Sequence, residues 1–213
     1  MNISHDLRTP LTAIRGYLDL LEREEKSAAV TRYLAFIENR TQALTQLTEE
    51  LFRYSVIMSA DHTLCLEATS LNRALEESVA AFYAALTARG VVPVIRMPER
   101  QITRMVDPAA LSRVFSNILG NALKYSDGDL EITLRDDGML TFANTAANLD
   151  EVQVGKMFDR FFSVEAARNS TGLGLTIART LVEQMHGAIT ARYADNRLQI
   201  DLQFPAAPAG KAR

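Results

Sequence analysis

Apolar residues in the first sixty positions recur with a helical period. The first group has spacings of four, three, four and three residues and comprises Leu7, Leu11, Ile14, Leu18 and Leu21. After a polar segment at 22–28, the second group recurs every seven residues and comprises Val30, Ile37, Leu44, Leu51 and Met58. Seven-residue repeats are typical of helices that pack along a narrow apolar seam. The pattern predicts two helices joined by a short turn, which is an antiparallel hairpin.

Pro10 interrupts the first of these helices. A proline inside a helix removes one hydrogen bond and crowds the preceding turn. The helix could instead begin at Pro10, with Thr9 as its cap. Because the apolar seam already starts at Ile3 and Leu7, we expect one continuous, kinked helix.

One hairpin cannot bury both sides of its two seams. Two hairpins that pack as a four-helix bundle would bury them, so we expect a homodimer. The spacing alone fits equally well a structural coiled coil in which His5 has no role. His5, Thr9 and Thr12 fall on a face away from the seam, and His5 and Leu7 differ by about 200° around the helix.

After Met58 the period changes, and short strands alternate with helices. We expect strands at 63–66, 91–95, 102–106, 130–134, 140–143, 188–193 and 198–204, and helices at 70–88, 108–125, 151–158 and 172–185. Mainly antiparallel strands mixed with helices predict a two-layer α/β sandwich. The fold class is therefore α+β, with a hairpin domain at 1–61, an α/β domain at 62–205 and a disordered tail at 206–213.

Composition narrows the function classes. The weak net charge of -3 over 213 residues does not point to a nucleic-acid surface. Cys65 is the single cysteine, which excludes an internal disulfide and fits a reducing compartment; its apolar neighbours suggest that it is buried. No apolar run is long enough to span a bilayer.

Two asparagines with a lysine and a tyrosine suggest a site for a polyphosphate. Asn117 and Asn121 are one helical turn apart, and Lys124 and Tyr125 follow on the same helix. Amide oxygens suit Mg²⁺, which takes oxygen ligands while keeping those of phosphate and water. The lysine ammonium can meet a phosphate group. On their own, the two asparagines could equally be ordinary exposed residues.

A glycine pair precedes the last long helix, in the run Gly172-Leu173-Gly174-Leu175. Glycines allow close approach of the backbone, and the first amides of a helix attract anions. Arg168, in the polar loop just before, could reach a terminal phosphate. A plain junction between a loop and a helix is the alternative. Three phenylalanines within 158–162 are either core residues or anchors of a lid.

These motifs, in this order, resemble a sensor histidine kinase of two-component signalling. Residues 4–11, Ser-His-Asp-Leu-Arg-Thr-Pro-Leu, resemble the phospho-acceptor box of that family. Residues 117–125 resemble its magnesium and ATP box, residues 158–162 its phenylalanine box, and residues 172–175 its second glycine box. The resemblance covers nearly all of residues 1–205.

The resemblance implies a dimerisation and phosphotransfer hairpin followed by a Bergerat-type ATP-binding domain. It implies that His5 is phosphorylated on Nε2 by ATP and passes the phosphoryl group to an aspartate in the receiver domain of a response regulator. Asp6 would hold Nδ1–H and orient the imidazole ring. Thr9 matches the position that, in similar kinases, places a water molecule for dephosphorylation of the regulator.

The resemblance also assigns the nucleotide contacts. Asn121 is the main magnesium ligand, with Asn117 as its helper. The phosphate contacts are Lys124, Tyr125 and Arg168, with Gly172, Leu173 and Gly174 in the loop. It further implies a cytoplasmic domain of a membrane-anchored sensor, attached through segments outside this sequence.

One motif departs from the family pattern. Where the family has Asp-x-Gly-x-Gly, this chain reads Asn144-Thr-Ala-Ala-Asn148. Asn144 could still accept from the adenine amino group, but a neutral oxygen makes a weaker contact than a carboxylate. We therefore expect weak ATP affinity and looser selectivity for the base.

Two rival functions remain open from the sequence. The first is a degenerate, catalytically weak kinase that acts as a dimeric docking or phosphatase module, which the missing Asp-x-Gly-x-Gly favours. The second is an ATPase of the same fold, of chaperone or mismatch-repair type, which would hydrolyse ATP without an acceptor helix.

Overall fold

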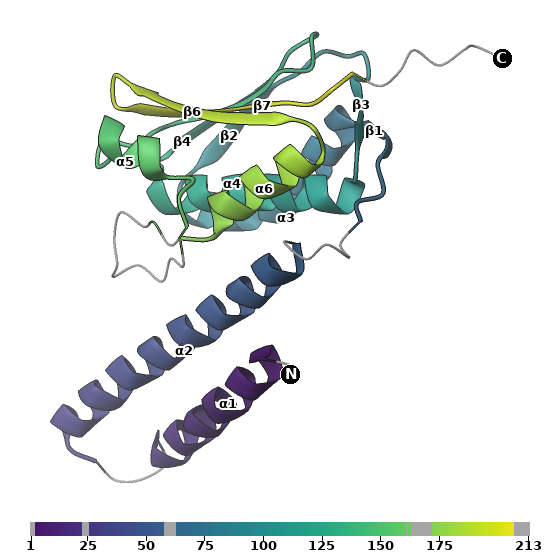
Figure 1. The fold of residues 1–213 in the computed structure, drawn as a ribbon. Coiled ribbons are helices and arrows are strands. Elements are labelled where there is room, and N and C mark those ends of the chain that lie inside the picture. Colours follow the sequence, from purple (N-terminus) through teal and green to yellow (C-terminus); the bar gives the residue numbers. More distant parts are fainter. Residues whose placement is uncertain (1–2, 23–25, 58–62, 161, 163–171, 207–213) are drawn as a thin grey trace.

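The computed structural model describes residues 3–22, 26–57, 63–160, 162 and 172–206. Figure 1 shows a long helical hairpin that leads through α2 into an α/β domain. Within the described residues, none of the helices has the length and apolar character to cross a membrane. The predicted disordered tail lies outside the described residues, except for Ala206, which forms an antiparallel bridge with Arg104.

The hairpin consists of α1 (Ile3–Glu22) and α2 (Ala28–Ile57), as predicted. Helix α1 is continuous through Pro10, so the alternative start at the proline is wrong. Leu11 and Leu18 are buried between the two helices, whereas Ile14 and Leu21 remain exposed. Two of the four seam residues whose burial is described are therefore covered within one chain.

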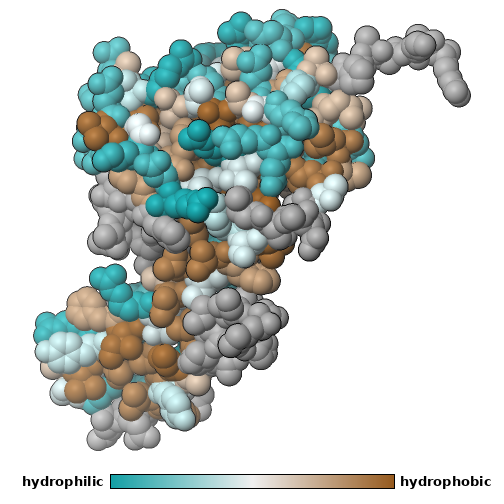
Figure 2. Space-filling model, viewed as in Figure 1, coloured by the Kyte–Doolittle hydropathy of each residue, from teal (hydrophilic) through white to brown (hydrophobic). Residues whose placement is uncertain are grey.

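The second seam is left uncovered by the hairpin. The exposed apolar residues of α2 include four of the five members of the seven-residue repeat, Val30, Ile37, Leu44 and Leu51. The fifth member, Met58, lies outside the described residues. Figure 2 shows apolar surface gathered on the hairpin, in contrast to the mixed surface of the α/β domain. An apolar face of this length on two adjoining helices is typical of an interface.

The α/β domain has two layers, which confirms the predicted α+β class (Figure 1). Its sheet has the order β2-β4-β5-β7-β6, in which only the β2–β4 pair of this sheet is parallel. The helices pack against one face of the sheet, and a separate pair, β1 and β3, closes one end. The elements are β1 (Glu67–Ser70), α3 (Leu71–Ala88), β2 (Val92–Arg96), β3 (Thr103–Val106), α4 (Pro108–Tyr125), β4 (Asp129–Leu134), β5 (Leu140–Thr145), α5 (Glu151–Lys156), α6 (Gly174–Gln184), β6 (Ala188–Ala194) and β7 (Arg197–Gln203).

Side-chain caps set where two of the long helices begin. The Ser70 hydroxyl accepts from the backbone N–H of Arg73 at the start of α3. The Asp107 carboxylate accepts from the N–H of Ala110, and Pro108 follows at the first helical position of α4. Both caps satisfy amides that have no partner inside the helix. Helix α4 thus begins and ends where the sequence predicts.

The linker between the domains differs from the prediction. Residues 63–66 do not form a strand; the strand begins later, at Glu67, where β3 supplies its partner. Cys65 is exposed, so its predicted burial is wrong. Its backbone N–H donates to Asp107 Oδ2 over 2.9 Å, while Oδ1 of the same carboxylate caps α4. The Asp107 side chain thus accepts a backbone hydrogen bond that a neighbouring strand would otherwise have accepted.

The turn after α6 requires a glycine for space. His186 takes the left-handed conformation with φ of 60°, and Gly187 follows it into β6. A Cβ at Gly187 would lie 2.6 Å from the backbone oxygen of Gln203 and 2.8 Å from the Phe204 ring. Both neighbours belong to the packed end of β7 and have little room to move.

Gly187→Ala should therefore destabilise the α/β domain by about 2 kcal/mol, as overpacking of well-packed sites does. Urea denaturation followed by circular dichroism would measure this change. Gly155→Ala is the control, because a Cβ there meets nothing within 4 Å. Equal stability of the two variants would contradict the close approach of β6 and β7 at this point.

A buried carboxylate lies on the outer face of the sheet. Asp201 of β7 has a side chain that is 8% exposed. Burial raises the pKa of Asp201, but hydrogen bonds from Gln199, Thr141 and Arg192 outweigh this effect and leave the pKa below its ordinary value. The ionised form of Asp201 is therefore favoured by the fold.

The pKa of Asp201 is lower in the folded chain than the unfolded value of about 3.9, so ionised Asp201 stabilises the fold at pH values above the unfolded pKa. This contribution is lost as the pH falls through the folded pKa. Asp201→Asn should lower the free energy of unfolding by about 1.5–3 kcal/mol at pH 7, the range for hydrogen bonds to a charged group. The difference from the parent should shrink below pH ~4. Urea denaturation at pH 7 and at acid pH would measure it, and Asp136→Asn, at a side chain that is 72% exposed, is the control. A difference independent of pH would show that the charge of Asp201 is not responsible.

Candidate functional site

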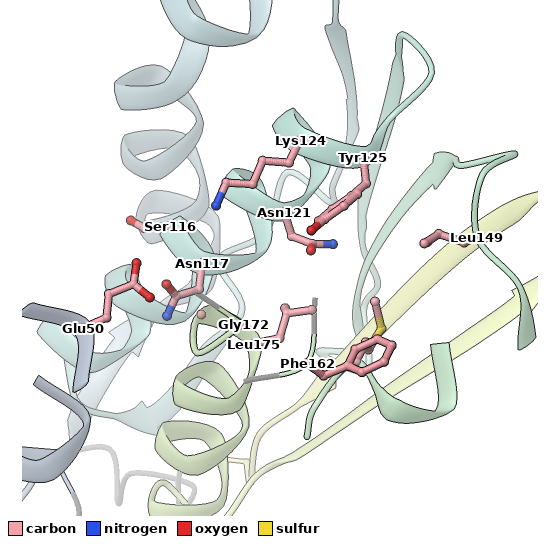
Figure 3. A pocket seen from close by; sticks show the side chains of 13 residues that line it. Glu50, Ser116, Asn117, Asn121, Lys124, Tyr125, Leu149, Phe162, Gly172 and Leu175 are labelled. Atoms are coloured by element: carbon pink, nitrogen blue, oxygen red, sulfur yellow. The ribbon is translucent and has the colours of Figure 1, made fainter. Parts of the chain in front are cut away.

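A cavity of about 130 Å³ lies between α4 and α6. The loop before α5 and the segment after α5 close one side, and α2 reaches its rim (Figure 3). Its described lining residues are Glu50, Ser116, Asn117, Gly120, Asn121, Lys124, Tyr125, Leu149, Met157, Phe162, Gly172, Gly174 and Leu175. The structure thus brings together six residues that the sequence selects: the two asparagines, the lysine, the tyrosine and the two glycines.

Helix α4 supplies the polar wall of the cavity. Its apolar face, which includes Phe115 and Leu119, is fully buried against the sheet and the neighbouring helices. The opposite face therefore turns Asn117, Asn121 and Lys124 into the cavity, as Figure 3 shows. Within the described residues, the buried Nδ2 of Asn117 has no hydrogen-bond partner. A buried amide without a hydrogen-bond partner raises the free energy of the fold, so this unpaired donor indicates a place for a ligand.

The N-terminus of α6 faces this wall. Gly172 has φ of 68°, a left-handed conformation that favours glycine. Leu173 is fully buried and anchors the turn, and no side chain caps the helix. A Cβ at Gly174 would lie 3.5 Å from Asn117 Oδ1, so the helix starts in contact with α4. Amides at a helix start without a side-chain cap favour an anion in the cavity.

The phenylalanine motif is divided between core and cavity. Phe158 packs on the core, and its carbonyl accepts from the Thr176 hydroxyl of α6 over 3.0 Å. Phe162 instead lines the cavity. The sequence left core and lid open for these residues; Phe158 is a core residue, and a role of Phe162 in a lid stays a prediction. Phe161 and Arg168 lie outside the described residues.

Asn144 is not among the residues that line this cavity. It is buried on β5, and its amide nitrogen donates to the Thr145 carbonyl over 3.0 Å. Leu149, which follows the same loop, does line the cavity. The proposed contact of Asn144 with a base therefore stays a prediction.

The residues of the phospho-acceptor motif stand on helix α1. His5, Asp6 and Thr9 lie within its continuous helical backbone. The description of the structure does not extend to their side chains. Their predicted roles therefore rest on the sequence.

Sequence reasoning missed several lining residues. Leu149 and Met157 carry no recognisable signal, because apolar residues at such positions are common in cores. Glu50 belongs to the hairpin helix α2, and an acid on an amphipathic helix is usually read as solvated. Glu50 lies one turn before Tyr54, on the face of α2 that packs on the α/β domain, and only the structure shows which element covers that face.

Comparison with known proteins assigns the chain to a family. Residues 106–208 match the model described as histidine kinase-, DNA gyrase B- and HSP90-like ATPase. Residues 1–59 match the model described as the His Kinase A (phospho-acceptor) domain. The chain belongs to the sensor histidine kinases. The phospho-acceptor match separates it from the other ATPases that share the first model.

Curated sensor kinases align along most of the chain. Sensor protein VanS of Enterococcus faecium is 33% identical over 98% of this chain and 56% of its own length. Sensor histidine kinase WalK of Bacillus subtilis is 32% identical over 89% of this chain and 33% of its own length. The histidine-protein kinase BaeS of Escherichia coli is 32% identical over 91% and 43%. The chain thus spans only part of the length of these relatives.

Solved structures of histidine kinases share the fold. Full-length ShkA in complex with AMPPNP matches with a TM-score of 0.69 and 22% identity, over 96% of this chain and 46% of that one. The Acinetobacter baumannii histidine kinase AdeS matches with a TM-score of 0.68 and 20% identity, over 96% and 98%. These matches support the sensor-kinase architecture of hairpin and α/β domain.

Proposed function

We propose that this chain binds ATP with Mg²⁺ in the cavity between α4 and α6 and uses it to phosphorylate His5. The observation that carries the proposal is the placement of Asn117, Asn121 and Lys124 opposite the N-terminus of α6. Family membership supplies the acceptor histidine. The structure of full-length ShkA in complex with AMPPNP supports nucleotide binding by this fold.

The described residues fit magnesium and polyphosphate. Asn121 and Asn117 offer neutral amide oxygens, which suit a cation that keeps water and phosphate among its ligands. Lys124 offers a positive charge, and the amides of Gly174 and Leu175 offer hydrogen-bond donors. When bound, the metal ion would neutralise the charge of the β- and γ-phosphates. The chain itself holds the phosphates in place and shields them from water with Leu149, Met157 and Phe162.

The reaction is transfer of one phosphoryl group to an imidazole. The Nε2 lone pair of His5 would attack the γ-phosphorus, the bond from that phosphorus to the bridging oxygen would break, and ADP would leave. Asp6 would accept from Nδ1–H, which orients the ring and stabilises its positive charge, as a carboxylate does beside other catalytic imidazoles. Positioning and charge neutralisation supply most of the rate in such transfers.

The partners follow from the hairpin. Its exposed repeat, Val30, Ile37, Leu44 and Leu51, would be buried by a second copy in a four-helix bundle. The phosphoryl group would then pass from His5 to an aspartate in the receiver domain of a response regulator. Thr9 would place a water molecule that hydrolyses the aspartyl phosphate of the regulator and releases inorganic phosphate.

Incubation with γ-labelled ATP and Mg²⁺ tests the proposal. Label that is lost in acid and kept in base is the signature of phosphohistidine and would support the kinase. Absence of such label, with a stable dimer, would instead support a docking or phosphatase module. The departure at Asn144 is the sequence feature that favours this second function.

A further inference from the structure

The hairpin contributes a carboxylate to the nucleotide cavity. Glu50 of α2 lines the cavity, and Figure 3 shows its carboxylate on the same side as the Asn117 amide and the Lys124 ammonium. Among the described lining residues, Glu50 is the acidic one and Lys124 the basic one. A carboxylate is a surprising lining group for a cavity that receives phosphates, because the two carry like charges.

Contacts at the end of α2 hold Glu50 in this place. Ile57 is 3% exposed within the core of the α/β domain, and its carbonyl accepts from Gln184 Nε2 of α6 over 3.0 Å. The Tyr54 ring is 9% exposed, and the Arg160 guanidinium lies 5.1 Å from its centre. Both contacts are made to the ATP domain rather than to α1.

The helical period then fixes the direction of Glu50. Leu47, Glu50, Tyr54 and Ile57 are spaced three, four and three residues apart, so they share one face of α2. Leu47 also packs against the core of the α/β domain. Glu50 thus lies on the docking face of α2 beside Leu47 and Tyr54, at the level of the cavity.

We propose that Glu50 makes the cavity discriminate between magnesium-bound and metal-free ATP; the inference rests on the proposed nucleotide site. Metal-free ATP brings its full negative charge to the Glu50 carboxylate in a half-enclosed space, where charges interact more strongly than in water. A magnesium ion on the phosphates offsets this charge and is itself attracted to a carboxylate. Glu50 therefore penalises the metal-free form, which cannot support phosphoryl transfer.

Calorimetric titration of the full chain with ATP tests the inference, once with excess Mg²⁺ and once with a chelator. In the isosteric Glu50→Gln variant, the ratio of the metal-free Kd to the magnesium Kd should fall about tenfold, the effect of removing one like charge at close range. Most of the change should be tighter binding of metal-free ATP. Thermal denaturation of both proteins would show whether the substitution alters folding.

Glu49→Gln is the matched control, because it removes the same charge from the neighbouring position, which does not line the cavity. Its ratio of Kd values should equal that of the parent. An unchanged ratio in Glu50→Gln, or the same fall in both variants, would overturn the inference while leaving ATP binding intact. If the parent bound no ATP with or without Mg²⁺, the proposed nucleotide site itself would fail.

Discussion

His5→Gln should abolish the acid-labile label that the parent protein acquires from γ-labelled ATP. Glutamine keeps a polar side chain of similar reach but has no nucleophilic nitrogen, so no bond to phosphorus can form. The substitution lies on α1, outside the cavity, and ATP binding should therefore be unchanged. Labelling followed by acid and base treatment measures the first effect, and calorimetry measures the second.

His62→Gln is the control, since it removes another histidine from the chain and should leave the label in place. Acid-labile label that persisted in His5→Gln would move the acceptor to another residue. Phosphate release that continued at the parent rate in His5→Gln would favour a hydrolytic ATPase. Loss of label together with retained ATP binding is the outcome that the kinase requires.

Asn121→Ala should weaken the binding of ATP in the presence of Mg²⁺ by about 10- to 100-fold, the range seen when groups that support a metal ion are removed. The side chain lies in the cavity between Asn117 and Lys124, at the level where the phosphates are expected. Removing its oxygen takes away a metal ligand but no positive charge. Calorimetry with and without a chelator separates these contributions.

The metal dependence of the loss is the decisive feature of this prediction. With the chelator present, Asn121→Ala should bind ATP nearly as tightly as the parent does. Lys124→Ala should bind ATP more weakly than the parent both with Mg²⁺ and with the chelator. If Asn121→Ala lost the same affinity with and without Mg²⁺, Asn121 would contact the nucleotide directly. Its assigned role as a metal ligand would then be wrong.

Local signals predicted most of the fold. Asp107 followed by Pro108 set the start of α4, and Ser70 set the start of α3, because both caps act on neighbouring amides. The strand at 63–66 was misplaced, since β3 pairs with Glu67–Ser70 and not with the apolar residues just before them. Exposure of Cys65 was missed for the same reason. Strand pairing depends on distant residues and is not encoded in a short window.

The lining residues of the cavity that lie close together in the sequence were predictable. Asn117 and Asn121 share a helix face by period alone, and glycines before α6 mark a helix start. The contribution of α2 was not predictable in this way. Tyr54 follows the apolar stripe of the hairpin, yet it packs beside Arg160 of the other domain. An apolar stripe shows that a residue is covered but does not name the element that covers it.

Asp107 connects the linker to the start of α4. One oxygen of its carboxylate holds the backbone of Cys65, and the other holds the first turn of α4. The backbone of Cys65 and the first turn of α4 therefore share one side chain as their hydrogen-bond acceptor. That helix carries Asn117 and Asn121 farther along its length. Asp107 thus couples the linker after α2 to the helix that forms the polar wall of the proposed nucleotide cavity.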